Sequence, residues 1–152
     1  MMVPGTMVQP VEILLVEDNP VDVLMTKEAF CGSRVCNNLH VAEDGEEAMD
    51  FLYKRGKYSS APSPEIILLD LNLPRKDGRE VLAEVKGDPS LRHIPVIILT
   101  TPQEPEDIWR SYDLHANCFI TKPVDMEQFT KDLECLGEFW FTLERLPIRP
   151  NP

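Results

Sequence analysis

The sequence predicts an α/β fold built on a doubly wound parallel sheet. Apolar runs rich in branched residues alternate with amphipathic stretches, which is the pattern of strands joined by crossover helices. The runs are apolar almost throughout, as expected for strands that helices cover on both faces. The chain has 152 residues, which suits one compact domain with a single core.

The first strand–helix unit begins at the sequence VEILLVEDN, residues 11–19, an apolar run that ends in acids. This pattern predicts a buried strand. Asn19 suits the N-cap of the following helix, and Pro20 suits its first position. We expect an amphipathic helix over 21–30 that stops at Gly32.

The second unit predicts a strand over 38–45 and a helix over 45–56 that closes at Gly56. The polar stretch 57–64, KYSSAPSP, is then a proline-bearing loop. It is longer than most connections between elements. Both a partner-facing role and a tolerated surface insertion are open for this loop.

The third unit consists of a strand over 65–70, a loop over 71–78 and a helix over 79–87. A turn over 88–95 leads into the fourth strand, VIILTT, at 96–101. Each strand again precedes a polar loop and an amphipathic segment, as a parallel sheet requires.

The last third of the chain predicts a helix over 102–114, a strand over 116–123 and a long helix over 124–146. Too few residues follow for a DNA-binding output module, so we expect output through protein contacts. The expected organisation is an N-terminal extension (1–10), one domain with an extended final helix (11–146) and a C-terminal tail (147–152).

Polar side chains stand at the carboxyl ends of four predicted strands. Glu17 and Asp18 end the first strand, Asp70 the third, Thr100 the fourth and Lys122 the fifth. In open parallel sheets these ends meet at one edge, where ligands bind. We therefore expect these five side chains to lie together.

This set of residues suits magnesium-assisted phosphoryl transfer. Converging carboxylates repel each other unless a cation is present, and all-oxygen ligation suits Mg²⁺. The metal shell would include Glu17, Asp18, Asp70 and the backbone carbonyl of Asn72. A lysine and a threonine hydroxyl can contact phosphoryl oxygens, and an aspartate can act as the nucleophile.

The motifs LLVEDNPVD, LLDLNLPRKDG, VIILTT and FITKP resemble those of response regulator receiver domains, over nearly all of 11–146. The resemblance implies a flavodoxin-like (βα)5 fold with strand order 2-1-3-4-5. It also implies a cis peptide bond between Lys122 and Pro123. The site roles it implies are phosphoacceptor for Asp70, magnesium pair for Glu17 and Asp18, metal-binding carbonyl for Asn72, switch hydroxyl for Thr100, essential lysine for Lys122 and switch aromatic for Phe119.

The chain is most similar to the single-domain regulators that partner cyanobacterial and bacterial phytochromes. The loop before the third strand, the sequence LNLPRKDGREVLAEVK and the ending GEFWFTLERLP carry this narrower likeness. It implies a phosphorelay protein that accepts a phosphoryl group from a sensor histidine kinase and is not itself an enzyme. A further phosphotransfer or target protein is implied downstream.

Charge and cysteine content limit the classes of partner. The net charge of −11 argues against nucleic acid and anionic membranes as partners. The acidity fits either a solubilising surface or an acidic cluster that binds a cation. The four cysteines have no metal-binding spacing, and no secretory signal is present, so a cytoplasmic protein with reduced thiols is expected. A redox role for Cys118 is left open.

The final predicted helix carries more apolar residues than one buried face needs. One stripe would cover the sheet. The remaining aromatic residues favour a homodimer through the face formed by helix four (102–114), strand five (116–123) and helix five (124–146). The apolar residues are Leu133, Leu136, Phe139, Trp140, Phe141, Leu143 and Leu146.

Four rival functions are weighed against these residues. A phosphatase with an aspartate nucleophile would need a second aspartate at position 72, where this chain has Asn72. A P-loop nucleotidase lacks its glycine spacing around RGKY. A flavodoxin-like binding module would not need Lys122 together with the acidic pair. A phosphorylation-independent scaffold or dimeric interaction module is left as the alternative.

Overall fold

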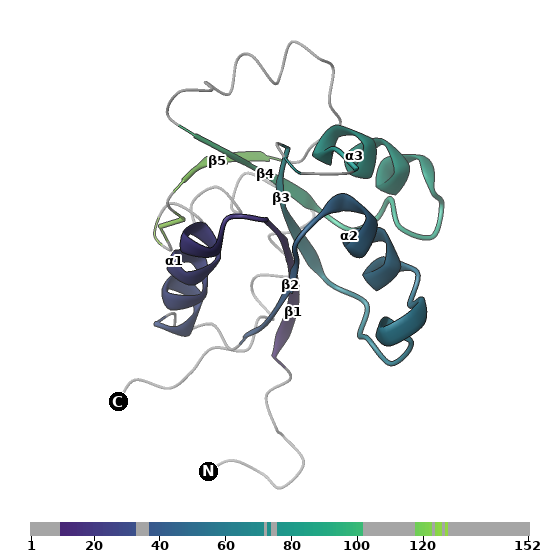
Figure 1. The fold of residues 1–152 in the computed structure, drawn as a ribbon, viewed down its shortest axis with the longest axis horizontal. Helices are drawn as coiled ribbons and strands as arrows, with labels where there is room; N and C mark the ends of the chain where they lie inside the picture. The colour runs from purple at the N-terminus through teal and green to yellow at the C-terminus, as the bar shows by residue number, and fades with distance from the viewer. Residues whose placement is uncertain are drawn as a thin grey trace, which may run out of the picture.

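The structure, a computed structural model, describes residues 10–32, 37–71, 73, 76–101, 118–122, 124, 125 and 127. Within them, five parallel strands form one sheet in the order β2-β1-β3-β4-β5, which confirms the predicted fold class and strand order (Figure 1). The strands are β1 (Val11–Val16), β2 (Asn37–Ala42), β3 (Ile66–Asp70), β4 (Val96–Thr100) and β5 (Cys118–Thr121).

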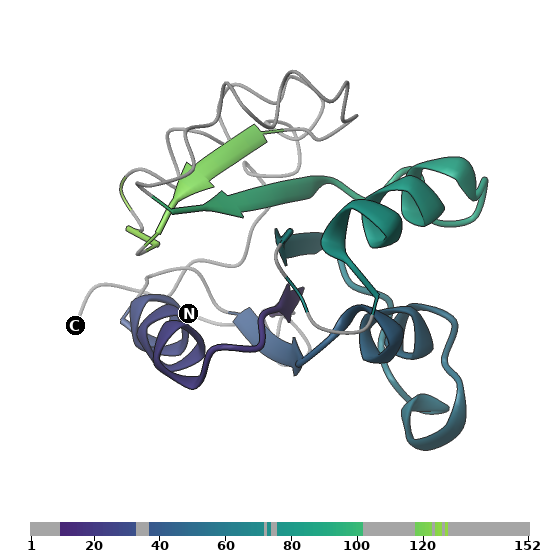
Figure 2. The same cartoon turned by 45° about the horizontal axis from the view of Figure 1, so that its top comes forward.

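Helices cover both faces of this sheet (Figures 1 and 2). Helix α1 lies on one face, and α2 and α3 lie side by side on the other. The central strands β1, β3 and β4 are buried along nearly their whole length, whereas the edge strand β2 is only partly buried. The helical elements are α1 (Pro20–Cys31), α2 (Gly45–Leu52), the short 3-10 helix η1 (Gly56–Tyr58) and α3 (Gly78–Gly87).

The core divides into two apolar clusters, one on each face of the sheet. Ile13 and Leu15 of β1 pack in the cluster that contains Phe30 of α1, whereas Leu14 and Val16 pack in the cluster shared with α2 and α3. This alternation follows from the two-residue period of a strand. Strands β3 and β4 are buried along their whole length, as the continuous apolar runs predict.

Helix α1 begins where the sequence predicts and is less amphipathic than expected. Asn19 caps it, and the cap at its other end is Gly32. Its side chains at Val21, Leu24 and Met25 are 62%, 56% and 42% exposed, so the expected apolar face is only partly buried. The helix is anchored through a narrow stripe, its two fully buried side chains being those of Thr26 and Phe30.

Helix α2 ends at Leu52, so the expectation that it continues to Gly56 is wrong. Lys54 takes a left-handed backbone conformation at φ 57°, which ends the helix. Gly56 at φ 54° then begins η1 instead of closing α2. This turn returns the chain so that the Tyr58 ring packs edge-on against Phe51, with centroids 5.3 Å apart.

Some expectations fall outside the described residues. They are the helix over 102–114, nearly all of the helix over 124–146 with its apolar set, and the Lys122–Pro123 bond. In the parts of the chain that the structure describes, no helix has the length and apolar character needed to cross a membrane.

Candidate functional site

The topology brings the predicted polar residues to one edge of the sheet. Asp70 is the last residue of β3 and Thr100 the last of β4, while Glu17 and Lys122 directly follow β1 and β5. The strands are parallel and in register, with Asp70 beside Leu99 and Thr100 beside Thr121. The backbone N–H of Lys122 extends this ladder by donating to the carbonyl of Thr100 at 2.7 Å.

Three carboxylates form an acidic cluster at this edge. Each of Glu17, Asp18 and Asp70 offers one oxygen, and these oxygens lie within 4.8 Å of one another. Glu17 is 1% exposed and Asp70 7% exposed, whereas Asp18 is exposed. Hard oxygen donors at this spacing fit a divalent cation such as Mg²⁺ or Mn²⁺, which would relieve the repulsion between the two buried carboxylates.

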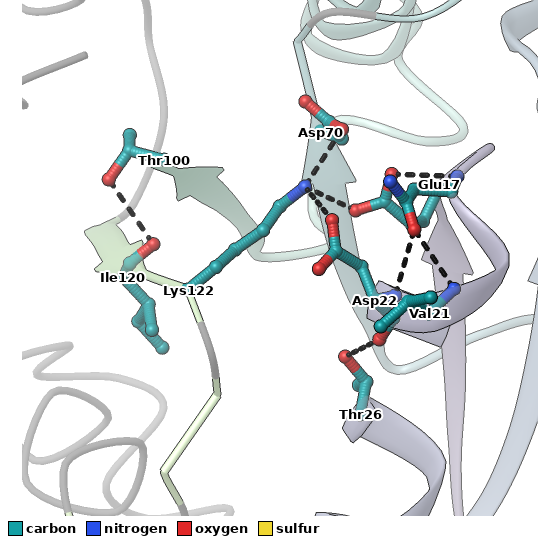
Figure 3. Close-up of polar contacts among 9 residues, drawn as sticks. Glu17, Val21, Asp22, Thr26, Asp70, Thr100, Ile120 and Lys122 are labelled. Atoms are coloured by element: carbon teal, nitrogen blue, oxygen red, sulfur yellow. Dashed lines mark hydrogen bonds and ion pairs between the residues drawn. The ribbon is translucent and has the colours of Figure 1, made fainter. Parts of the chain in front are cut away.

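Lys122 contacts three carboxylates at once (Figure 3). Its Nζ forms an ion pair with Glu17 Oε1, and it donates to Asp70 Oδ2 at 3.0 Å and to Asp22 Oδ2 at 3.2 Å. An ammonium group has three N–H donors, so these contacts engage all of them. The lysine side chain is 10% exposed, which shields the ion pairs from solvent.

The pKa values of Glu17 and Lys122 are both raised at this site. Burial raises the pKa of Glu17 from its ordinary 4.5 to about 7, helped by a hydrogen bond with Asp70 and opposed by Lys122. Burial would lower the pKa of Lys122, but its contacts with Glu17 and Asp70 outweigh burial and raise that pKa. Lys122 therefore stays cationic throughout the physiological range.

The start of α1 orders the loop that carries the acidic pair. The Asn19 side chain accepts hydrogen bonds from the N–H groups of Val21 at 2.9 Å and Asp22 at 3.2 Å. The Asn19 N–H itself donates to Glu17 Oε2 at 3.2 Å. One short segment thus caps the helix and orients a buried carboxylate at the helix N-terminus, where negative charge is stabilised.

The end of β3 is held by a close contact with α3. A Cβ on Gly78 would lie 2.4 Å from the carbonyl oxygen of Asp70 and 2.5 Å from Cα of Leu71. The N–H of Gly78 donates to the carbonyl of Leu71 at 3.1 Å. Only a glycine allows the helix to start this close to the strand, so Gly78 fixes the backbone that carries Asp70.

Thr100 and Phe119 do not join the acidic cluster. The Thr100 side chain is 2% exposed, and its hydroxyl donates to the carbonyl of Ile120 at 3.4 Å, away from Asp70 (Figure 3). Phe119 is 9% exposed and belongs to the apolar cluster shared with α2 and α3. The structure therefore brings Glu17, Asp18 and Lys122 to Asp70, but it does not bring the Thr100 hydroxyl to the carboxylate.

Two predicted features of the site cannot be placed. Asn72 and its backbone carbonyl lie outside the described residues, as does the side chain of Cys118. The sequence did not predict one contact, the ion pair between Asp22 and Lys122. Asp22 lies in the first turn of the expected helix, but no local pattern in the sequence links it to Lys122.

Comparison with known proteins places the chain in a family. The model of the response regulator receiver domain matches residues 13–134. The response regulator Rcp1 of Synechocystis sp. (strain ATCC 27184 / PCC 6803 / Kazusa) is 44% identical over 138 residues, covering 91% of this chain and 94% of that protein. The solved Mn²⁺-bound form of response regulator Rcp1 has a TM-score of 0.69 and 43% identity, covering 93% of this chain and 100% of the other.

Two further solved structures are similar over most of their length. The bacteriophytochrome response regulator AtBRR is 48% identical with a TM-score of 0.80, covering 87% of this chain and 96% of the other. The phosphorylated cyanobacterial phytochrome response regulator RcpA is 47% identical with a TM-score of 0.70, covering 91% and 99%. With its fold, its acidic cluster and this family match, the chain belongs to the response regulator receiver domains.

Proposed function

We propose that this receiver domain accepts a phosphoryl group on Asp70 from a sensor histidine kinase, with Mg²⁺ as the metal. The observation that carries the proposal is the position of the Asp70 carboxylate, between the acidic pair and the Lys122 ammonium group. A carboxylate in this position can act as the nucleophile beside the Lys122 ammonium group and beside the metal ion that the acidic pair would hold. The protein is a phosphoacceptor that assists its own phosphorylation and dephosphorylation and is not a separate enzyme.

In the proposed reaction, a carboxylate oxygen of Asp70 attacks the phosphorus of a phosphohistidine. The P–N bond to the donor breaks as the O–P bond of the acyl phosphate forms, and the histidine nitrogen keeps the electron pair. The Lys122 ammonium group stabilises the charge on a phosphoryl oxygen through its N–H donors. Mg²⁺ bound by Glu17, Asp18 and Asp70, with the Asn72 carbonyl as a predicted ligand, would supply further positive charge there.

The relatives support a phytochrome-type kinase as the donor. RcpA and AtBRR are response regulators of a phytochrome and a bacteriophytochrome, and both match this chain over most of its length. The Mn²⁺-bound form of Rcp1 supports a divalent metal at a site of this kind. We extend both properties to this chain as part of the proposal.

We expect output through a change at Thr100 and Phe119. Movement of the Thr100 hydroxyl toward the phosphoryl group would break its bond to the carbonyl of Ile120 and alter the packing beside β5. The face formed by helix four, β5 and helix five is the proposed surface for a target protein or a second copy of the chain. If Thr100→Ala left phosphorylation-dependent binding unchanged, this switch assignment would be wrong.

Intact-mass measurement after incubation with acetyl phosphate tests the central step. With Mg²⁺ we expect one phosphoryl adduct on the wild-type protein, and with EDTA none. Asp70→Asn should lose the adduct, while Asp88→Asn, which removes a carboxylate far from the cluster, should keep it. An adduct that survives Asp70→Asn would refute the assignment, and no adduct under any condition would favour a phosphorylation-independent scaffold.

A further inference from the structure

We infer that Asp22 is a positioning residue for phosphoryl transfer, because it tethers the Lys122 ammonium group beside Asp70. The inference rests on the proposed function for its consequence on rate, but the tether itself is a property of the structure. Asp22 lies in the first turn of α1, and its Oδ2 accepts from Lys122 Nζ at 3.2 Å (Figure 3). The two residues are 100 positions apart in the sequence.

The three carboxylates around Lys122 differ in what else they can bind. Glu17 and Asp70 belong to the acidic cluster that fits a divalent cation, and Asp22 does not. Metal binding would draw on the oxygens of Glu17 and Asp70, and phosphorylation would consume an oxygen of Asp70. Asp22 is the member of the trio whose carboxylate is not committed to either event, so it can hold Lys122 before and after them.

The backbone around Asp22 makes it a rigid support. Its N–H donates to the Asn19 side chain at 3.2 Å, and its carbonyl accepts from the Thr26 hydroxyl at 2.8 Å. The side chain is about one-third exposed, at 31%, whereas that of Lys122 is 10% exposed. Asp22 thus reaches from a fixed helical turn at the surface to a lysine whose head lies inside the site.

A fixed ammonium group matters because an unrestrained lysine has many rotamers. Lys122 enters from β5, on the far side of the site from α1, and its long side chain spans the distance between them (Figure 3). A partner on α1 holds the head group where charge develops on the phosphoryl oxygens, so no reorganisation is needed when the donor arrives. Asp22 would therefore increase the rate of phosphorylation without touching the phosphoryl group.

Two measurements on the full chain test this role. The first is the ¹H–¹⁵N NMR signal of the Lys122 ammonium group, assigned by its loss in Lys122→Arg and recorded with and without Mg²⁺. The second is the rate of Asp70 phosphorylation by acetyl phosphate at saturating Mg²⁺. The variants are Asp22→Ala, which removes the acceptor, Asp22→Asn, which keeps an oxygen but not the charge, and Glu28→Gln, which removes a negative charge elsewhere on α1.

With Mg²⁺ present, we expect the Lys122 signal in the wild type and in Glu28→Gln and its loss by broadening in Asp22→Ala. Phosphorylation of Asp22→Ala should be about tenfold slower, the size of effect that loss of a positioning partner has around metal sites. Asp22→Asn should recover part of this rate. Thermal unfolding of each variant shows that the fold is intact and does not report on the lysine.

The tether is refuted if Asp22→Ala keeps the Lys122 signal and the wild-type rate, or if the wild type with Mg²⁺ shows no Lys122 signal. Glu28→Gln matching Asp22→Ala in both measurements would also refute it, because helix charge alone would then explain the effect. Failure of the wild type to become phosphorylated would refute the proposed function instead, and the NMR comparison would still decide whether Asp22 holds Lys122.

Discussion

Two partly buried lysines lie at opposite ends of the strands, and their surroundings differ. The carboxyl ends of the strands form the carboxyl edge of the sheet, and the amino ends form the amino edge. Lys122, at the carboxyl edge, contacts the carboxylates of Glu17, Asp22 and Asp70. Lys86 lies at the end of α3, by the amino edge, and its Nζ donates to the carbonyls of Arg92 at 3.4 Å and Ile94 at 3.0 Å. Carboxylates surround the first lysine, and the second donates to two backbone carbonyls.

The pKa values of the two lysines move in opposite directions for this reason. Burial lowers the pKa of Lys86, because carbonyl dipoles do not offset the lost hydration of a full charge. The carboxylates reverse this effect at Lys122 and raise its pKa. The carboxyl edge therefore holds more negative charge than Lys122 neutralises, which costs stability unless a cation binds.

The largest expected effect follows from removing the Lys122 ammonium group at the carboxyl edge of the sheet. Lys122→Met should lower the free energy of unfolding of the metal-free protein by about 3 kcal/mol, because Glu17 and Asp70 would remain buried without a partner. The matched variant Lys86→Met should change it by less than about 1 kcal/mol. Urea unfolding in EDTA at pH 8 measures both, and equal losses would contradict the contrast between the two edges.

The second prediction concerns the metal. Mg²⁺ at about 100 times its dissociation constant should raise the free energy of unfolding of the wild type by about 2.7 kcal/mol, because it binds the folded state. Glu17→Gln should abolish most of this gain, since it replaces a buried carboxylate of the cluster with a neutral amide. Glu46→Gln, an exposed change of the same charge on α2, should keep the full gain. A full gain in Glu17→Gln would exclude Glu17 as a ligand.

The third prediction compares the two ends of α3. Gly78→Ala should destabilise the protein by about 2 kcal/mol, because the added methyl group would collide with the backbone of Asp70 and Leu71. Gly87→Ala meets no atom within 4 Å and should stabilise the protein by about 0.5 kcal/mol. Gly78→Ala should also slow phosphorylation by acetyl phosphate. Thermal unfolding and intact mass measure the two effects, and a stable Gly78→Ala would show that the strand end is not tightly held.

The smallest expected effect lies at the amino edge. The Tyr53 hydroxyl donates to Asp88, joining the ends of α2 and α3. This hydrogen bond raises the pKa of Tyr53 from 10.0 to about 12 and lowers the pKa of Asp88. A raised tyrosine pKa adds stability that is complete below pH 10 and is lost as the pH rises through 12. A lowered aspartate pKa adds stability that is present above its ordinary 3.8 and is lost in more acidic solution.

Tyr53→Phe should therefore cost most stability between about pH 5 and pH 9 and least in acid. Difference absorbance at 295 nm between the wild type and Tyr53→Phe should show the tyrosine ionising near pH 12. In Asp88→Asn the same ionisation should return toward pH 10. An unchanged midpoint in Asp88→Asn would mean that another group shifts the pKa of Tyr53.

Sequence reasoning succeeded where a local pattern has one structural solution. Asn19 followed by proline predicted the start of α1, and the apolar run before Asp70 predicted the buried strand β3. It failed where the local signal was ambiguous. Gly56 resembles a helix end, but Lys54 has already turned the chain into a left-handed conformation. The sequence predicted an amphipathic helix for α1, but only Thr26 and Phe30 of this helix are buried.

The sequence by itself determined the sheet and the members of the acidic cluster. Parallel strands must end at a common edge, so residues that follow apolar runs meet there whatever the details of packing. Only the tertiary structure decided which carboxylates share Lys122 and which glycine holds Asp70. Asp22 and Lys122 lie 100 residues apart, and no local pattern specifies the distance between α1 and β5. Such contacts depend on how the helices seat against the sheet, which is set by the packing of the whole core.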